Sequence, residues 1–305
     1  MKKWLFLCLV VLLSGCQAAT HSNVSAQKST QKPTETTTTT TASAETPTTE
    51  PVQKTTTPTL FIHGYQGGPA SFGGMIQRFA QKDWVSNEMV LTISPDGTVS
   101  TEGVLSKRAV NPTIQVLFAD NQNNEWNQAE WIRQALLYLK KEGIEQVNLV
   151  GHSMGGVSGF RYLTTFGELS AAGAESLDPA LPKVAKFIAI GAPFNEFIDT
   201  SSHQTVTDLV TNGPTEASPR YQEFQGLLKQ GGHRLPIELI AGQLSDEELS
   251  DGTVPTTSAL AINHLLAANG YSVTEKIIKG SQAQHSQLHE NQEVDEDIAA
   301  FLWEK

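Results

Sequence analysis

The segment Gly151-His152-Ser153-Met154-Gly155 constrains the fold of this chain more than any other stretch. An apolar run over residues 146–150 precedes it, and small residues follow at 155–159. This order predicts a strand, a sharp turn and a helix, with a serine at the turn. A serine held in such a strained turn projects its hydroxyl from the edge of a sheet, and the glycines let strand and helix approach closely. A serine that only caps the following helix is the alternative.

The amino terminus indicates where the protein works. Lys2 and Lys3 precede an apolar run over residues 4–13, which is short for a membrane span and typical of a secretory signal peptide over residues 1–15. The sequence Leu-Ser-Gly-Cys ending at Cys16 resembles the lipobox of bacterial lipoproteins. That resemblance implies cleavage before Cys16 and its acylation, which would hold the exported protein on the outer face of the cell membrane. An ordinary signal peptide cut slightly later is the alternative.

Residues 16–58 differ in composition from the rest of the chain. They are dominated by Thr, with Ser, Ala, Gln, Pro and Glu, and contain almost no large apolar side chain. Such a segment buries too little surface to offset its chain entropy, so we expect a lipid-anchored, disordered tether. The two cysteines of the chain are Cys8 and Cys16. The mature domain therefore has no disulfide and must be stabilised by its core.

Residues 59–305 are long enough for one α/β domain. The whole chain has 32 acidic and 21 basic residues, a formal net charge of −11, and no basic run. This charge argues against a nucleic acid partner and against electrostatic attachment to an anionic membrane, so the lipid would carry the attachment. The sequence leaves the oligomeric state open.

Strand and helix patterns alternate along this domain. Helical periodicity or helix boundaries are found in four segments, at residues 71–81, 124–141, 256–269 and at the carboxyl terminus. Short apolar strands are predicted between them, at residues 59–62, 89–93, 113–118, 147–150, 184–190, 237–241 and 273–278. A hairpin-like excursion is expected between the second and third strands. The alternation predicts a mostly parallel sheet with helices on both faces and functional residues at the carboxyl ends of strands.

A serine hydroxyl becomes a nucleophile only with a base in reach and a carboxylate that orients the base. A serine turn of this kind between a strand and a helix is called a nucleophile elbow, and when it carries this chemistry, the acid and then the histidine follow it along the chain. Only His285 and His289 follow the last predicted strand. We favour His285 as the base because it is nearer the strand end, and we keep His289 as the alternative.

The acid is expected after the strand at residues 237–241. Asp251 stands at a glycine turn before a proline-led helix, a setting that fixes a side chain, and Asp246 is the alternative. An oxyanion hole needs preorganised donors. Met154 would supply one backbone N–H and Tyr65 the other, with Gln66 less favoured. No metal or organic cofactor is needed for this chemistry, and no cluster with metal-ligand spacing stands out.

Five short motifs carry a resemblance to a known superfamily. They are F-I-H-G-Y at 61–65, V-G-H-S-M-G-G at 150–156, G-A-P-F-N at 191–195, S-D-G-T-V-P at 250–255 and H-S at 285–286. On these residues the domain resembles the α/β-hydrolase superfamily, and more narrowly a poorly characterised family from low-GC Gram-positive bacteria distantly related to lipases. The resemblance implies an α/β-hydrolase fold, a Ser153–Asp251–His285 triad and carboxylic-ester hydrolysis.

The substrate is less constrained. A small-molecule or lipid ester fits a surface-anchored esterase, whereas a thioesterase, amidase or acyltransferase acting on cell-envelope material would use the same residues. A binding lipoprotein that keeps the fold without catalysis is a third class. Residues 195–234 form a long insert with scattered apolar side chains. It is either a lid over the site or a surface excursion packed on the domain.

Overall fold

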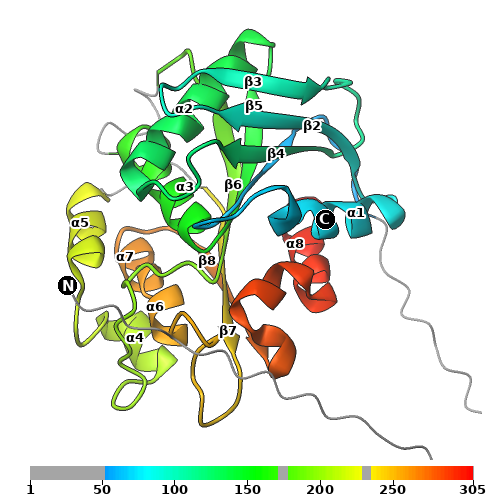
Figure 1. Ribbon diagram of the computed structural model, residues 1–305. Coiled ribbons are helices and arrows are strands. Elements are labelled where there is room, and N and C mark those ends of the chain that lie inside the picture. The colour runs from blue at the N-terminus through cyan, green and yellow to red at the C-terminus, as the bar shows by residue number, and fades with distance from the viewer. Residues whose placement is uncertain (1–51, 171–177, 229–234, 305) are drawn as a thin grey trace, which may run out of the picture. The chain divides into compact units, whose positions relative to one another are not determined.

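The computed structural model describes residues 52–170, 178–228 and 235–304 (Figure 1). The predicted signal peptide, Cys16 and the tether up to residue 51 lie outside these ranges. None of the described helices combines the length and the apolarity that crossing a membrane requires.

The described residues form one eight-stranded sheet with helices on both faces. Its strands are β1 (Thr59–Ile62), β2 (Ser86–Ile93), β3 (Val99–Gly103), β4 (Pro112–Phe118), β5 (Gln146–His152), β6 (Lys183–Ile190), β7 (Ile237–Gln243) and β8 (Val273–Lys279). The α-helices are α1 (Pro69–Gln81), α2 (Glu125–Lys141), α3 (Met154–Thr165), α4 (Val206–Asn212), α5 (Pro219–Leu227), α6 (Thr256–Ala259), α7 (Ile262–Ala268) and α8 (Gln292–Trp303). Two 3₁₀ helices, η2 (Ser281–Ala283) and η3 (His285–Glu290), follow β8.

The strand order is β3-β2-β4-β1-β5-β6-β7-β8. Every neighbouring pair is parallel except β2 and β3, which pair antiparallel at one edge. The predicted parallel α/β sheet and its hairpin excursion are therefore confirmed. Ile62 of β1 pairs with Gly151 of β5, which pairs with Ala189 of β6. Because these strands end at one level, the loops that leave them meet at the same edge of the sheet.

One face of the sheet packs against α1 and α8. Phe61 of β1 and Val150 of β5 belong to this core, and the ring of Phe61 lies 5.2 Å from that of Phe72 on α1. All four residues of β1 are buried, as expected for a central strand covered on both faces. The predicted apolar stripe of the last helix is buried here at Val294 and Ile298.

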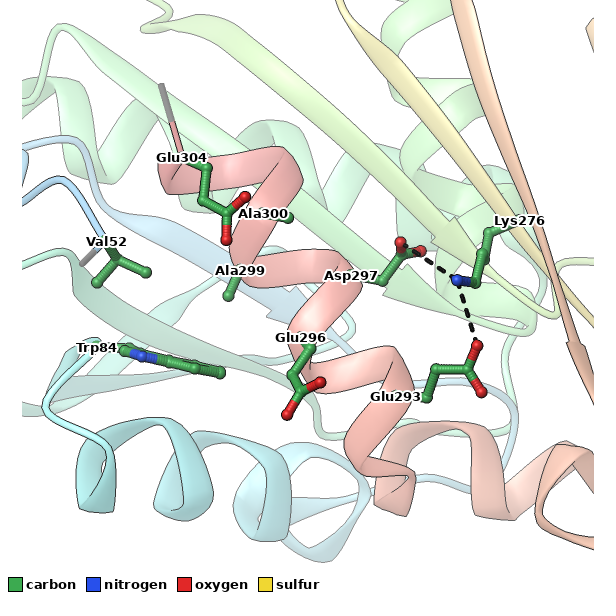
Figure 2. Close-up of a pocket in the computed structure, with 9 residues that line it drawn as sticks. All are labelled: Val52, Trp84, Lys276, Glu293, Glu296, Asp297, Ala299, Ala300 and Glu304. Carbon is green, nitrogen blue, oxygen red and sulfur yellow. Dashed lines mark ion pairs between the residues drawn. The ribbon is translucent and has the colours of Figure 1, made fainter. Parts of the chain in front are cut away.

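A cavity of about 300 Å³ opens beside α8 (Figure 2). Trp84 and acidic side chains of α8 line it, and Lys276 of β8 lies 3.2 Å from Glu293 and 4.0 Å from Asp297. Its lining includes no residue of the segment around Ser153. This cavity is therefore separate from the predicted site.

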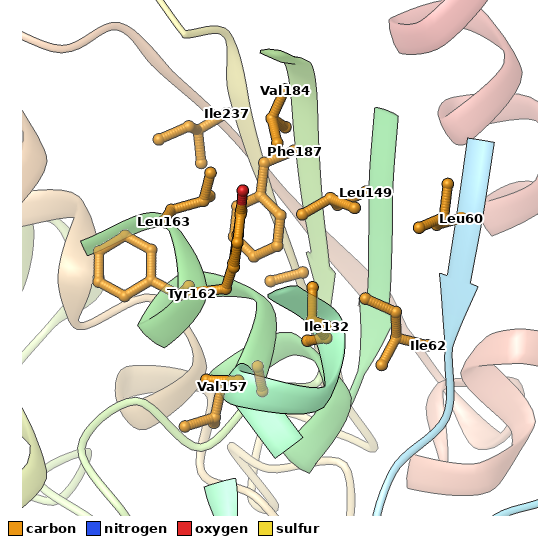
Figure 3. Close-up of a cluster of buried hydrophobic side chains, with 14 of the residues drawn as sticks. Leu60, Ile62, Ile132, Leu149, Val157, Tyr162, Leu163, Val184, Phe187 and Ile237 are labelled. Atoms are coloured by element: carbon orange, nitrogen blue, oxygen red, sulfur yellow. The ribbon is translucent and has the colours of Figure 1, made fainter. Parts of the chain in front are cut away.

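The other face packs against α2 and α3 (Figure 3). Leu60 and Leu149 of the sheet meet Ile132 of α2 and Val157 of α3 in this larger core. The side chain of Asn124 caps α2 by accepting the Asn127 N–H at 2.9 Å, which satisfies one of the free donors at the helix start. Helix α3, which begins directly after Ser153, packs against α2, the helix that this cap stabilises.

The segment just before β1 packs on the domain. Gln53 donates its N–H to the carbonyl of Trp303 at 2.8 Å, and the N–H of Asn148 donates to the carbonyl of Pro58 at 2.9 Å. Between them, the Thr55 N–H donates to Asn111 Oδ1 at 2.6 Å. Residues 53–58 therefore bond to the domain, although their composition placed them within the tether predicted over residues 16–58.

Candidate active site

Ser153 lies between the end of β5 and the start of α3, as the sequence predicts. Its backbone has φ 55° and ψ −125°. A positive φ is unfavourable for a residue with a side chain, and such strain gathers at functional sites. The Ser153 N–H donates to the carbonyl of Ile190 on β6 at 2.8 Å, which helps hold the turn.

Close backbone approaches explain the glycines around this turn. A Cβ atom on Gly155 would lie 2.3 Å from the carbonyl oxygen of Ile62, and one on Gly151 would lie 2.5 Å from the carbonyl oxygen of Gly155. On Gly64, in the loop after β1, a Cβ would lie 2.8 Å from the Cβ of Ser153. The loop after β1 and the turn at Ser153 therefore touch, and no side chain fits at these three positions.

The structure brings Ser153, His285 and Asp251 into one hydrogen-bonded chain. Nε2 of His285 lies 2.9 Å from the Ser153 Oγ, and Nδ1 of His285 lies 2.7 Å from Oδ2 of Asp251. A carboxylate only accepts, so Nδ1 carries the proton and Nε2 is left to accept from the serine hydroxyl. This geometry meets the requirement for activating a serine, a base within hydrogen-bonding reach that is itself oriented by a carboxylate.

Asp251 is almost fully buried, with 1% of its surface exposed. Its Oδ1 accepts the N–H groups of Thr253 at 2.9 Å and Val254 at 2.7 Å, so the carboxylate is oriented by the glycine turn that follows it. Its backbone carbonyl also accepts the His285 N–H at 2.9 Å. Asp246, the alternative acid, lies exposed on the same loop.

His289, the alternative base, lies beside the chain of hydrogen bonds and outside it. Its Nδ1 is 3.2 Å from Oε1 of Glu290, and its ring centroid is 4.8 Å from that of His152. Burial is the main cause that lowers the pKa of His289. Of the two histidines left open by the sequence, His285 is therefore the one placed against Ser153.

The two expected oxyanion donors come from different parts of the chain, Met154 directly after Ser153 and Tyr65 in the loop after β1. Met154 opens α3, where backbone N–H groups have no acceptor within the helix. In the loop after β1, the Gln66 N–H is occupied, because it donates to the carbonyl of Asn121 at 2.8 Å. Of the two candidate donors in that loop, Gln66 is therefore the one already engaged, and Tyr65 stays the expected donor. The Tyr65 side chain is half exposed.

His63 supports this loop, a role that sequence reasoning did not assign. Its Nε2 accepts the Phe118 N–H at 3.1 Å, so its Nδ1 carries the proton and donates to the carbonyl of Gly64 at 2.8 Å. Burial lowers the pKa of His63, which keeps the ring neutral as this pairing requires. The imidazole thereby ties the loop after β1 to β4.

The described part of the insert at residues 195–234 is fastened to the domain. Arg220 of α5 donates to both carboxylate oxygens of Glu125 on α2, at 2.8 and 2.7 Å, and to the carbonyl of Pro193 at 2.8 Å. The ring of Phe224 lies 4.9 Å from that of Phe160 on α3. Residues 229–234, the end of the predicted lid segment, lie outside the described ranges.

A metal site needs several ligating side chains around one point. Over residues 52–304, the two gaps excepted, no group of three or more His, Cys, Asp or Glu side chains is arranged to hold a metal ion.

Comparisons with known proteins agree with this architecture. A family model described as "Alpha/beta hydrolase of unknown function (DUF915)" matches residues 46–305. A gene product of Listeria innocua has a similar structure, with 30% identity, a TM-score of 0.68, and coverage of 81% of this chain and 93% of that chain. A Lactobacillus plantarum protein, named provisionally as a cell surface hydrolase, has 20% identity, a TM-score of 0.59, and coverage of 81% and 89%. A comparison with curated proteins finds no match. Since the family model spans most of the sequence, the chain belongs to the DUF915 family of α/β hydrolases.

Proposed function

We propose that this hydrolase cleaves carboxylic esters through an acyl-enzyme formed on Ser153. The observation that carries the proposal is the hydrogen-bonded chain from the Ser153 Oγ through the His285 ring to Asp251. In this proposal Ser153 is the nucleophile, His285 the general base and Asp251 the residue that orients the base.

The proposed reaction follows from these positions. Nε2 of His285 takes the hydroxyl proton as the Ser153 Oγ attacks the ester carbonyl, and Asp251 stabilises the imidazolium that forms. The tetrahedral intermediate collapses when His285 gives the proton to the leaving alcohol. Water, activated by the same ring, then releases the acid and restores Ser153.

Charge that develops on the carbonyl oxygen needs donors that are already in place. The N–H groups of Tyr65 and Met154 are the proposed oxyanion hole. The close contact between Gly64 and Ser153 supports this assignment, because it holds the loop of Tyr65 against the nucleophile turn. No cofactor takes part in the proposed reaction.

The proposed substrate is a small-molecule or lipid ester outside the cell. The half-exposed aromatic ring of Tyr65, in the proposed oxyanion loop, offers apolar surface to such a substrate. Attachment to the membrane through a lipid on Cys16 rests on the lipobox-like sequence. Metabolic labelling with a radioactive fatty acid tests it, because Cys16→Ala should abolish incorporation.

Hydrolysis of p-nitrophenyl esters of increasing acyl length tests the proposed activity. We expect turnover by the parent protein and loss of nearly all turnover in Ser153→Ala, with an unchanged melting temperature. A fluorophosphonate probe should label the parent and not the variant. Full activity in Ser153→Ala would refute the assignment. Labelling without ester turnover would show an active nucleophile with another acyl substrate, which thioester and amide substrates in the same panel would identify.

A further inference from the structure

His285 lies in a segment with little regular structure to fix it. It is the first residue of the short 3₁₀ helix η3, six residues beyond the end of β8. A base must be held close to its nucleophile, since a displacement of about 1 Å can lower a rate about 100-fold. The contacts that hold the main chain of His285 therefore bear directly on the proposed chemistry.

Both backbone polar groups of His285 are bound by other elements. Its N–H donates to the carbonyl of Asp251. Its carbonyl oxygen lies 2.9 Å from Nε2 of His152, the residue immediately before the nucleophile. A carbonyl can only accept, so Nε2 of His152 carries the proton and donates it. The main chain of the base is thereby held between the acid and the nucleophile turn.

The ring of His152 is enclosed by other imidazoles. It is 6% exposed, and its centroid lies 4.7 Å from that of His285 and 4.8 Å from that of His289. Burial, and then the two neighbouring histidines, lower the pKa of His152 well below its ordinary value. A neutral ring with one proton on Nε2 suits a fixed donor to a carbonyl.

The far end of η3 is held as well. Arg78 of α1 donates to the carbonyl of His289 at 2.9 Å and to Glu290 at 2.7 Å. Because the rings of His289 and His152 pack in a T-shaped contact, the hold of Arg78 on the end of η3 also supports the contact at its start.

We propose that His152 is a positioning residue that keeps His285 in reach of Ser153 through the hydrogen bond to the His285 carbonyl. The inference rests on the proposed function of that site. His152 itself transfers no proton to or from the substrate, since its N–H is directed at a main-chain oxygen.

Two substitutions of His152 separate the hydrogen bond from the volume of the ring. His152→Leu fills the space without a donor, and we expect kcat to fall about 10- to 100-fold with little change in KM. His152→Gln places an amide N–H at a similar reach, and it should retain most of the parent kcat. His264→Leu is the matched control, because Nδ1 of His264 also lies 3.2 Å from a main-chain carbonyl, that of Val210, and its helix α7 carries none of the three proposed catalytic residues.

The full-length protein in detergent is assayed with p-nitrophenyl esters, and the melting temperature of each variant is measured. The low-field proton NMR signal of the His285 Nδ1–H, hydrogen-bonded to Asp251, gives a readout that needs no turnover. We expect it to weaken or shift in His152→Leu and to persist in His152→Gln. Equal kcat in His152→Leu and parent, or equal losses in the Leu and Gln variants, would overturn the positioning role. If the parent hydrolyses no ester while the signal still depends on His152 in this way, the positioning role stands and the ester activity fails.

Discussion

Asp251→Asn is the most informative single change at this site, because the structure dictates how the new amide must sit. Oδ1 of Asp251 accepts two backbone N–H groups, from Thr253 and Val254. An asparagine must keep its carbonyl oxygen there, since an NH₂ group would face two donors. Its NH₂ group then points at Nδ1 of His285 and forces that nitrogen to accept. The His285 proton moves to Nε2, which can no longer take the proton of Ser153.

The expected loss follows from this wrong tautomer. A serine hydrolase whose histidine is held in that form loses about 10⁴-fold in kcat, equivalent to about 5 kcal/mol of barrier. Stability should change little, because the turn keeps both of its hydrogen bonds to the side chain. Ester hydrolysis and thermal denaturation measure the two effects, with the exposed Asp246→Asn as the control. A loss below about tenfold would refute the tautomer argument, and a large fall in melting temperature would show that packing had changed instead.

Three further predictions concern stability and are checked by urea or thermal unfolding. Gly155→Ala should lower the free energy of unfolding by about 1–3 kcal/mol, because the new Cβ would lie 2.3 Å from the carbonyl oxygen of Ile62 on β1. Gly73→Ala, at an open position of α1, should be neutral or stabilising. Burial raises the pKa of Glu238 to about 8, so folding takes up a proton between pH 4.5 and 8. As the pH rises through that window, the free energy of unfolding of the parent should fall by up to about 1.4 kcal/mol per pH unit relative to that of Glu238→Gln. A difference in unfolding free energy between parent and variant that does not vary with pH would contradict this. Glu125→Ala should cost about 3–5 kcal/mol, since it leaves two largely buried arginines without this carboxylate.

The nucleophile turn could be predicted because its constraints are local. A strained serine between a strand and a helix needs small neighbours within two residues, and those glycines stand together in the sequence. Chain order reduced the candidate bases to His285 and His289, and the glycine turn favoured Asp251 over Asp246 as the acid. The contacts show that His285 and Asp251 lie in one hydrogen-bonded chain with Ser153, whereas Asp246 lies exposed.

Other features had no local signal. The strand β3 reads V-S-T-E-G and is mostly exposed, so no apolar alternation marks it; it forms because β2 offers a partner at the sheet edge. The bond from His152 to the His285 carbonyl joins residues 133 positions apart. Likewise Arg220 and Glu125 meet across 95 positions. Their proximity follows from strand order and loop path, which composition and periodicity do not encode.

The order of strands also explains why His285, the proposed base, needs so much support. In the sheet, β8 lies three places from β5, and neighbouring strands are about 4.8 Å apart, so a residue leaving β8 must cross about 14 Å to reach Ser153. The chain makes this crossing between Lys279 and His285, partly through the short helix η2.

Such a span has few hydrogen bonds of its own to fix its end. Asp251, carried by the loop after β7, and His152, at the end of β5, bind the two backbone groups of His285 from either end of the gap. His285 thus comes from the edge of the sheet but is fixed by residues nearer the centre of the sheet. His152 is therefore expected to affect the proton transfer between Ser153 and His285, although it takes no part in that transfer.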